Sequence, residues 1–209
     1  MAGSALAAVC PGDLPPPTVA LTVERGAMRI DHTLDPAEIG AVRARLNGAA
    51  VQPRPGRTVG LTVAALRIGK ATRGRLLPAI DQDGLCVQVT HVDLRVGFLD
   101  QTVYVPRSYA PGSCEYEAVL EHERAHVADN LAVLDNLAQS FRSRAEDLAL
   151  TMNPVRATSR EEARSRPVDL VSAALAPVAE DFAQAQADHA ARRDSQEEYA
   201  AIAARCRNW

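Results

Sequence analysis

The sequence has no long apolar run and no excess of positive charge. No segment approaches the roughly 20 uninterrupted apolar residues that a membrane-spanning helix needs. Lys and Arg total 23 against 26 Asp and Glu, and the formal net charge is -3. The chain therefore lacks an overall positive field of the kind that attracts nucleic acid or anionic lipid. These absences predict a soluble protein without a membrane span and without a nucleic-acid partner.

Closely spaced cysteine pairs, which are typical of structural zinc and redox sites, are also absent. The four cysteines, Cys10, Cys86, Cys114 and Cys206, are far apart, and none forms a Cys-x-x-Cys pair. An even number with such spacing is typical of two disulfides formed in an oxidising compartment. The alternative is four reduced, buried cysteines in a cytoplasmic protein. We expect disulfides and therefore a periplasmic or secreted location.

Length and composition predict one globular domain behind a short lead-in. The chain has 209 residues, of which 47% are hydrophobic, and this is enough for a single sizeable core. Residues 1–17, MAGSALAAVCPGDLPPP, are expected to form an extended Pro-rich lead-in or the remnant of an export signal. Because no Lys or Arg precedes the apolar part of this segment, an ordinary N-terminal tail fits it equally well. The single domain is expected over residues 18–209.

The first part of this domain, residues 18–110, is predicted to be a mostly antiparallel sheet with one short helix. Two β-branched runs, TVALTVE and AMRIDHTL, are separated by an Arg-Gly turn and are expected to form a hairpin. Asp35 as a cap, Pro36 at the first helical position and Gly48 as a stop predict the helix. The further strand candidates are RTVGLTVAALRIG, GLCVQVTHVDLRVGFLD and QTVYVP.

The second part, residues 113–209, is predicted to be helical. Neither Gly nor Pro occurs from Ser113 to Met152, which predicts one long helix. A polar linker follows, and a second long helix is expected from about Val168 to the C-terminus. Two long helices joined by a modest linker should pack antiparallel. The predicted fold class is therefore α+β, with a sheet region followed by a long antiparallel helical hairpin.

The first long helix carries the motif His-Glu-Arg-Ala-His at residues 122–126. On a helix, His122 and His126 lie on the same face about one turn apart, and Glu123 projects beside them. Both imidazoles can therefore reach one ion. A zinc ion held by three protein ligands lowers the pKa of its bound water to about 7, and a neighbouring carboxylate can accept a proton from that water. The motif predicts a metal site with Glu123 as general base.

The segment AVLEHERAHVADN resembles the zincin metallopeptidases. The order of strands, motif helix and second long helix is similar to that of uncharacterised bacterial proteins predicted to be secreted zinc-dependent proteases. The resemblance implies a zincin-like domain, a Zn²⁺ cofactor and hydrolysis of peptide bonds in a peptide or protein substrate. Two other functions stay open: a non-catalytic exported binding or scaffold protein with a structural zinc or no metal, and a zinc hydrolase of a non-peptide amide.

The third metal ligand is expected from the second long helix. The downstream Gly and His of metzincins are missing. Glu146, at the ligand spacing of thermolysin-like enzymes, would lie about 30 Å from His126 along the same unbroken helix. If the hairpin reverses near residue 160, residues 188–199 lie opposite His126. Within this window His189 lies on the apolar stripe, so we predict His189 as the ligand and Asp194 as the next candidate.

Two further features concern the substrate. Tyr199 lies further along the stripe of the second helix and is a candidate catalytic residue that stabilises an oxyanion, with Arg192 on the same stripe as the alternative. The strand around Val103–Val105, just before the motif helix, is a candidate edge to which an extended peptide could add.

The hairpin also bears on the disulfides. Reversal near residue 160 places Cys114 opposite Cys206, which leaves Cys10 to pair with Cys86. The rival pairing of Cys86 with Cys114 fits the sequence equally well, because spacing alone does not choose among connectivities.

Overall fold

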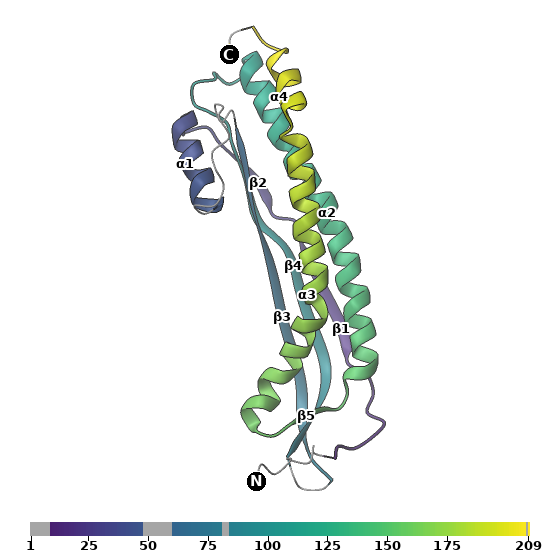
Figure 1. The fold of residues 1–209 in the computed structure, drawn as a ribbon. Coiled ribbons are helices and arrows are strands. Elements are labelled where there is room, and N and C mark those ends of the chain that lie inside the picture. Colours follow the sequence, from purple (N-terminus) through teal and green to yellow (C-terminus); the bar gives the residue numbers. More distant parts are fainter. Residues whose placement is uncertain (1–8, 48–59, 81–83, 208) are drawn as a thin grey trace, which may run out of the picture. The chain divides into compact units, whose positions relative to one another are not determined.

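The computed structural model describes residues 9–47, 60–80, 84–207 and 209 (Figure 1). The chain divides into two compact units, each assembled from three separate segments. The first unit contains Met1–Glu24, Arg67–Gly97 and Asp135–Phe182, and the second contains Arg25–Leu66, Phe98–Leu134 and Ala183–Trp209. Both units combine strands with helices, so neither corresponds to the predicted sheet region or to the predicted helical region.

The described elements follow one another along the chain as labelled in Figure 1. Their order is β1 (Thr18–Glu24), β2 (Ala27–Asp31), α1 (Pro36–Asn47), β3 (Leu61–Pro78), β4 (Leu85–Tyr104), α2 (Cys114–Met152), β5 (Val155–Ala157), α3 (Arg160–Arg193) and α4 (Gln196–Ala203).

The sheet is organised around β4 and differs from the prediction in strand direction. β1 pairs with β4 in parallel, with Thr18 opposite His91. β2 also pairs with β4 in parallel, with Ala27 opposite Asp100, which is the same offset of 73 residues. β3 and β5 pair with β4 as well. The predicted mostly antiparallel sheet, and the predicted hairpin of TVALTVE with AMRIDHTL, are therefore wrong.

Gly26 explains why the Arg-Gly signal does not reverse the chain. Its φ of 66° lies in the left-handed region, which glycine adopts without strain. A Cβ at this position would lie 2.7 Å from the backbone oxygen of Phe98, so the backbone approaches β4 very closely here. A glycine between two strand-like runs fits either a turn or such a close approach, and local sequence does not separate the two.

Helix α1 begins as the sequence predicts. The Asp35 carboxylate accepts hydrogen bonds of 2.9 Å from the backbone N–H groups of both Ala37 and Glu38. The Glu38 carboxylate accepts one of 2.8 Å from the N–H of Asp35, which completes a reciprocal cap. The helix runs to Asn47, and the predicted stop at Gly48 lies outside the described residues.

The long helix α2 has 39 residues and matches the predicted Gly- and Pro-free segment. The second helix differs from the prediction at both ends. α3 starts at Arg160 instead of Val168 and includes Pro167, which is buried together with Ala163 and Val171 at helical spacing. We infer that α3 tolerates Pro167 because the free energy gained by burying its ring offsets the loss of the backbone hydrogen bond that proline cannot donate. Near the C-terminus the helix breaks, and α4 starts at Gln196.

The core of the second unit packs the end of β4 against the start of α2. Its buried members are Val103, Val105, Val119, Leu120 and Val127. Val103 pairs with Ile30 of β2 and is fully buried. This strand is therefore not the exposed edge that the sequence suggested.

Each unit contains one disulfide, which links segments that are far apart in the sequence. Cys10 is bonded to Cys86 in the first unit, and Cys114 is bonded to Cys206 in the second. The predicted disulfides are confirmed, with the pairing that follows from an antiparallel hairpin. Among the described helices, none is both long enough and apolar enough to cross a membrane.

Candidate metal centre

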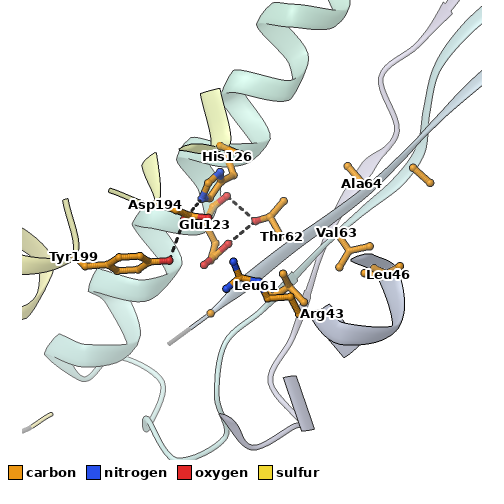
Figure 2. Close-up of a pocket in the computed structure, with 13 residues that line it drawn as sticks. Arg43, Leu46, Leu61, Thr62, Val63, Ala64, Glu123, His126, Asp194 and Tyr199 are labelled. Atoms are coloured by element: carbon orange, nitrogen blue, oxygen red, sulfur yellow. Dashed lines mark hydrogen bonds and ion pairs between the residues drawn. The ribbon is translucent and has the colours of Figure 1, made fainter. Parts of the chain in front are cut away.

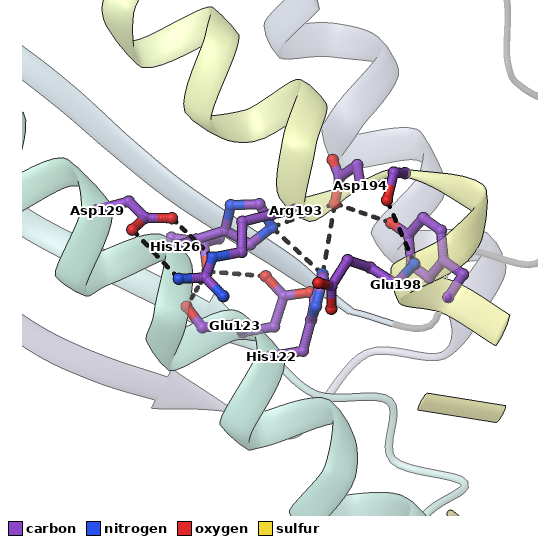
Figure 3. A network of polar contacts seen from close by, with 10 residues as sticks. His122, Glu123, His126, Asp129, Arg193, Asp194 and Glu198 are labelled. Atoms are coloured by element: carbon purple, nitrogen blue, oxygen red, sulfur yellow. Dashed lines mark hydrogen bonds and ion pairs between the residues drawn. The ribbon is translucent and has the colours of Figure 1, made fainter. Parts of the chain in front are cut away.

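Three donor atoms from two parts of the second unit converge on one point. His122 and His126 project from the same face of α2, and Asp194 lies between the end of α3 and the start of α4 (Figure 3). The two Nε2 atoms are 3.3 Å apart. Asp194 Oδ1 lies 3.4 Å from His122 Nε2 and 3.2 Å from His126 Nε2. The predicted pair of histidines is therefore joined by a carboxylate oxygen.

These separations fit a bound metal ion. In a tetrahedral zinc site with bonds of about 2.0 to 2.1 Å, two donor atoms lie about 3.3 to 3.4 Å apart. Two imidazole nitrogens and one carboxylate oxygen are donors that zinc commonly takes. Within the part of the chain that the structure describes, the group has three members, His122, His126 and Asp194. This group could hold a metal ion and leave one coordination position open.

Asp194 takes the position that the sequence argument gave first to His189. His189 Nδ1 lies 3.8 Å from Asp129 Oδ1, its side chain is 38% exposed, and His189 is not a member of the three-donor group. The difference arises because α3 ends at Arg193, whereas the apolar stripe was extended through one continuous helix. Asp194, the second candidate, is the residue that joins the two histidines.

The break that exposes Asp194 has a sequence signal that the prediction missed. The Ser195 hydroxyl accepts a hydrogen bond of 3.2 Å from the backbone N–H of Glu198, so Ser195 caps α4. Ser-x-x-Glu is the pattern of a helix N-terminus. Reading it at residues 195–198 would have ended the preceding helix at Asp194.

A fork of hydrogen bonds fixes the end of α3 next to Asp194. Arg193 donates to the two carboxylate oxygens of Asp129, over 2.8 Å and 3.3 Å (Figure 3). Two turns earlier on α3, Gln186 donates to Asn130, which in turn donates to the buried Gln101. Asp129 is three residues beyond His126 on α2. The two hydrogen bonds from Arg193 therefore hold the end of α3, next to Asp194, against the part of α2 that bears the histidines.

Glu123 is a buried carboxylate beside this group. Its side chain is 4% exposed, and the Thr62 hydroxyl of β3 donates to its Oε2 over 2.8 Å (Figure 2). Burial raises the pKa of Glu123, while the nearby charge of His126 and the bond from Thr62 partly oppose the rise. Gly60 closes over the carboxylate, since a Cβ there would lie 2.6 Å from Oε1. No sequence pattern pointed to Thr62 or Gly60.

The charges of the three donors are coupled. Burial by itself would raise the pKa of Asp194, but hydrogen bonds with His122 and His126 outweigh it and lower that pKa below its ordinary value. Burial by itself would lower the pKa of His126, but the bond to Asp194 and the charge of Glu123 raise it. The ionised form of Asp194 is thus the stable one at neutral pH, as metal ligation requires.

Tyr199 of α4 contacts two of the three donor residues, Asp194 and His122. Its hydroxyl donates to Asp194 Oδ1 over 3.0 Å, and its ring centroid lies 5.5 Å from that of His122. Burial and the negative charge of Asp194 raise the pKa of Tyr199. The phenol therefore keeps its proton at neutral pH and remains a hydrogen-bond donor.

A cavity of about 460 Å³ opens beside these groups (Figure 2). Its lining joins α1, the start of β3, and the helices that carry the metal group. Its lining includes Arg43, Leu46, Leu61, Thr62, Val63, Glu123, His126, Asp194 and Tyr199. A molecule in this cavity would meet a metal-binding group and a buried carboxylate together.

Comparison of the chain with protein-family models, with curated proteins and with solved structures found no match. The chemistry of the site therefore carries the functional argument.

Proposed function

We propose that this chain is a zinc-dependent peptidase in which His122, His126 and Asp194 bind Zn²⁺ and Glu123 is the general base. The observation that carries the proposal is a buried carboxylate directly beside a three-donor group at the wall of one cavity. Structural zinc sites are closed by four protein ligands, whereas catalytic sites keep a position open for water or substrate. The three donors favour a catalytic site over a structural zinc in a scaffold protein.

Glu123 would carry the proton in this reaction. A zinc ion at the group would supply a Lewis acid and lower the pKa of water at its open position to about 7. Glu123 would take a proton from the attacking water and pass it to the leaving amine. Its raised pKa suits a group that must both accept and release a proton. Thr62 binds Oε2, so Oε1 is the oxygen that would take the proton.

Tyr199 would act on the substrate oxygen. Attack on a peptide carbonyl puts negative charge on that oxygen, and a nearby donor lowers the energy of the charged state. Tyr199 lines the same cavity and, because its pKa is raised, retains the hydroxyl proton that it would donate. Its present acceptor is Asp194 Oδ1, so substrate would compete for this donor.

An extended peptide would bind along the start of β3. Residues 60–65 of this region line the cavity, and among the described strands β3 pairs only with β4. The second edge of β3 can therefore add the backbone of a substrate by main-chain hydrogen bonds. This edge replaces Val103–Val105 as the proposed docking strand.

The two disulfides fit an oxidising compartment. We therefore propose that the peptidase works outside the cytoplasm, in the periplasm or as a secreted protein.

Metal analysis and cleavage mapping test the proposed function. Protein purified without chelator is expected to contain about one zinc per chain by mass spectrometry. It should cleave bonds in a digest-derived peptide mixture, and the cleavage should stop when the metal is chelated and return when zinc is restored. His122→Ala should lose both metal and cleavage. Stoichiometric zinc without any cleavage above that of the His122→Ala protein would instead favour a scaffold.

Gly60→Ala is expected to slow cleavage by about 10- to 100-fold with zinc content unchanged. The added Cβ would meet Glu123 Oε1 at 2.6 Å and Val119 Cγ1 at 2.7 Å, so the carboxylate must move. A shift of about 1 Å in a catalytic group can cost about 100-fold in rate. Gly69→Ala, on the strand β3 that follows Gly60, is the control, because its Cβ would meet Arg95 Cβ at an ordinary 3.5 Å. Equal cleavage rates for the two variants would show that Gly60 does not affect the position of the Glu123 carboxylate.

A further inference from the structure

We propose that the cavity selects substrates that carry a carboxylate, and that Arg43 of α1 is the residue that binds it. The inference rests on the proposed peptidase function and names a substrate class for it. Of the described residues that line the cavity, Arg43 is the only Lys or Arg. Figure 2 shows its guanidinium turned into the cavity from the wall opposite α2 and α4.

Arg43 is not occupied by another part of the described chain. It forms no hydrogen bond and no ion pair with a described residue, although its side chain is only half exposed. Three other arginines of the second unit have carboxylate partners: Arg107 pairs with Asp35, Arg193 with Asp129, and Arg205 with Glu121. A partly buried guanidinium without a partner is costly, and a substrate anion would remove that cost.

The charge balance of the cavity favours an anion at this position. Its two acidic lining residues, Glu123 and Asp194, carry two negative charges when ionised. A bound divalent cation would offset both charges. Among the described lining residues, Arg43 then remains as the uncompensated charge, close enough for its field to act on the hydroxyl of Tyr199. A neutral or cationic substrate group would leave this charge unpaired.

The surroundings of Arg43 strengthen the selectivity. Leu61 and Val63, which are partly buried, line the same cavity, and apolar lining lowers the local dielectric constant. The planar guanidinium can donate two parallel hydrogen bonds to one carboxylate. Arg43 is thus a specificity-determining residue, separate from the metal group that would carry out the hydrolysis. An acidic side chain and the C-terminal end of a peptide both offer the required carboxylate.

Four peptide libraries test the inference. Each contains N-acetylated decapeptides that are degenerate except for one fixed central residue, and the degenerate positions exclude Asp, Glu, Lys and Arg. Three libraries have an amidated C-terminus with Glu, Gln or Lys at the centre. The fourth has Gln at the centre and a free C-terminal carboxylate. Cleavage is measured with the zinc-loaded protein, and binding is measured by calorimetry with its Glu123→Gln variant.

The Glu library, or the library with a free C-terminus, is expected to be bound and cleaved about 10- to 100-fold better than the amidated Gln library. The favoured library identifies the source of the carboxylate. Arg43→Gln should remove the preference, and Arg43→Glu should shift it toward the Lys library. Arg45→Gln is the matched control on the same helix, since Arg45 is exposed and its Nε donates to the backbone oxygen of Ala41.

The two proposals fail in different ways. Equal binding and cleavage of all four libraries, or a preference that Arg43→Glu does not change, would overturn the carboxylate site while leaving the peptidase intact. Selective binding of a carboxylate library without cleavage of any library would overturn the peptidase and retain the site. If the protein neither cleaves nor distinguishes the libraries, both proposals are wrong.

Discussion

Replacing Glu123 with Gln is expected to reduce peptide cleavage by about 100- to 10,000-fold while zinc remains bound. The amide has nearly the same size as the carboxylate and can still accept the hydrogen bond from Thr62 through its oxygen. It cannot take a proton from water. The three metal donors are unchanged, so zinc content should equal that of the parent protein. Initial cleavage rates and metal analysis on the same samples measure the two effects.

Glu121→Gln is the matched control for this substitution. Glu121 is two residues earlier on α2, is exposed, and bonds to Arg205 over 2.7 Å. Surface ion pairs contribute about 0 to 1 kcal/mol to stability, so losing this one should change neither folding nor cleavage appreciably. If Glu123→Gln cleaves as fast as Glu121→Gln, Glu123 is not the base and the proposed mechanism fails.

The part of the site that lies on α2 could be predicted because its geometry is local. The spacing of His122 and His126 and the absence of Gly and Pro from the helix together determine that the two imidazoles share a face. Glu123 follows from the same geometry. The expected hairpin of two long helices made Cys114 with Cys206 one of two equally weighted pairings, and this pairing is the one that the structure has.

The third donor was harder because it depends on where a helix ends. The window opposite His126 contained both His189 and Asp194, and the choice turned on whether one helix continued through it. The capping pattern from Ser195 to Glu198 indicates the end of α3, but it competes with an apolar stripe that continues beyond the break and that favoured one continuous helix. Helix termini are the least certain part of such predictions, since caps and packing act together there.

The sheet-borne residues could not be predicted, because strand pairing depends on contacts far apart in the sequence. Thr62 reaches Glu123 across 61 residues, and no local pattern marks Thr62 as its partner. The direction of β2 was misjudged for a related reason. Its parallel pairing with β4 places Ala27 opposite Asp100, 73 residues away, whereas the visible signal was only a glycine that also suits a turn.

Replacing Asp194 with Ala is expected to weaken zinc binding by more than about 100-fold. Loss of a residue that only supports a ligand costs about 10- to 100-fold in metal affinity, so loss of a ligand itself should cost more. The substitution leaves two imidazoles at the site and removes the acceptor of the Tyr199 hydroxyl. Competition with a zinc-binding dye measures the affinity, and circular dichroism shows whether the helices persist.

His189→Ala separates the two candidates for the third ligand. If Asp194 is the ligand, His189→Ala should bind zinc about as tightly as the parent, because its nearest charged contact is Asp129 at 3.8 Å. Asp188→Ala controls for the loss of a nearby carboxylate, since Asp188 is exposed and bonds only to Gln184. Strong loss of zinc in His189→Ala, with little loss in Asp194→Ala, would reverse the assignment. The three changes all lie within six residues of the helix break, so a general effect on folding would weaken zinc binding in all three variants alike.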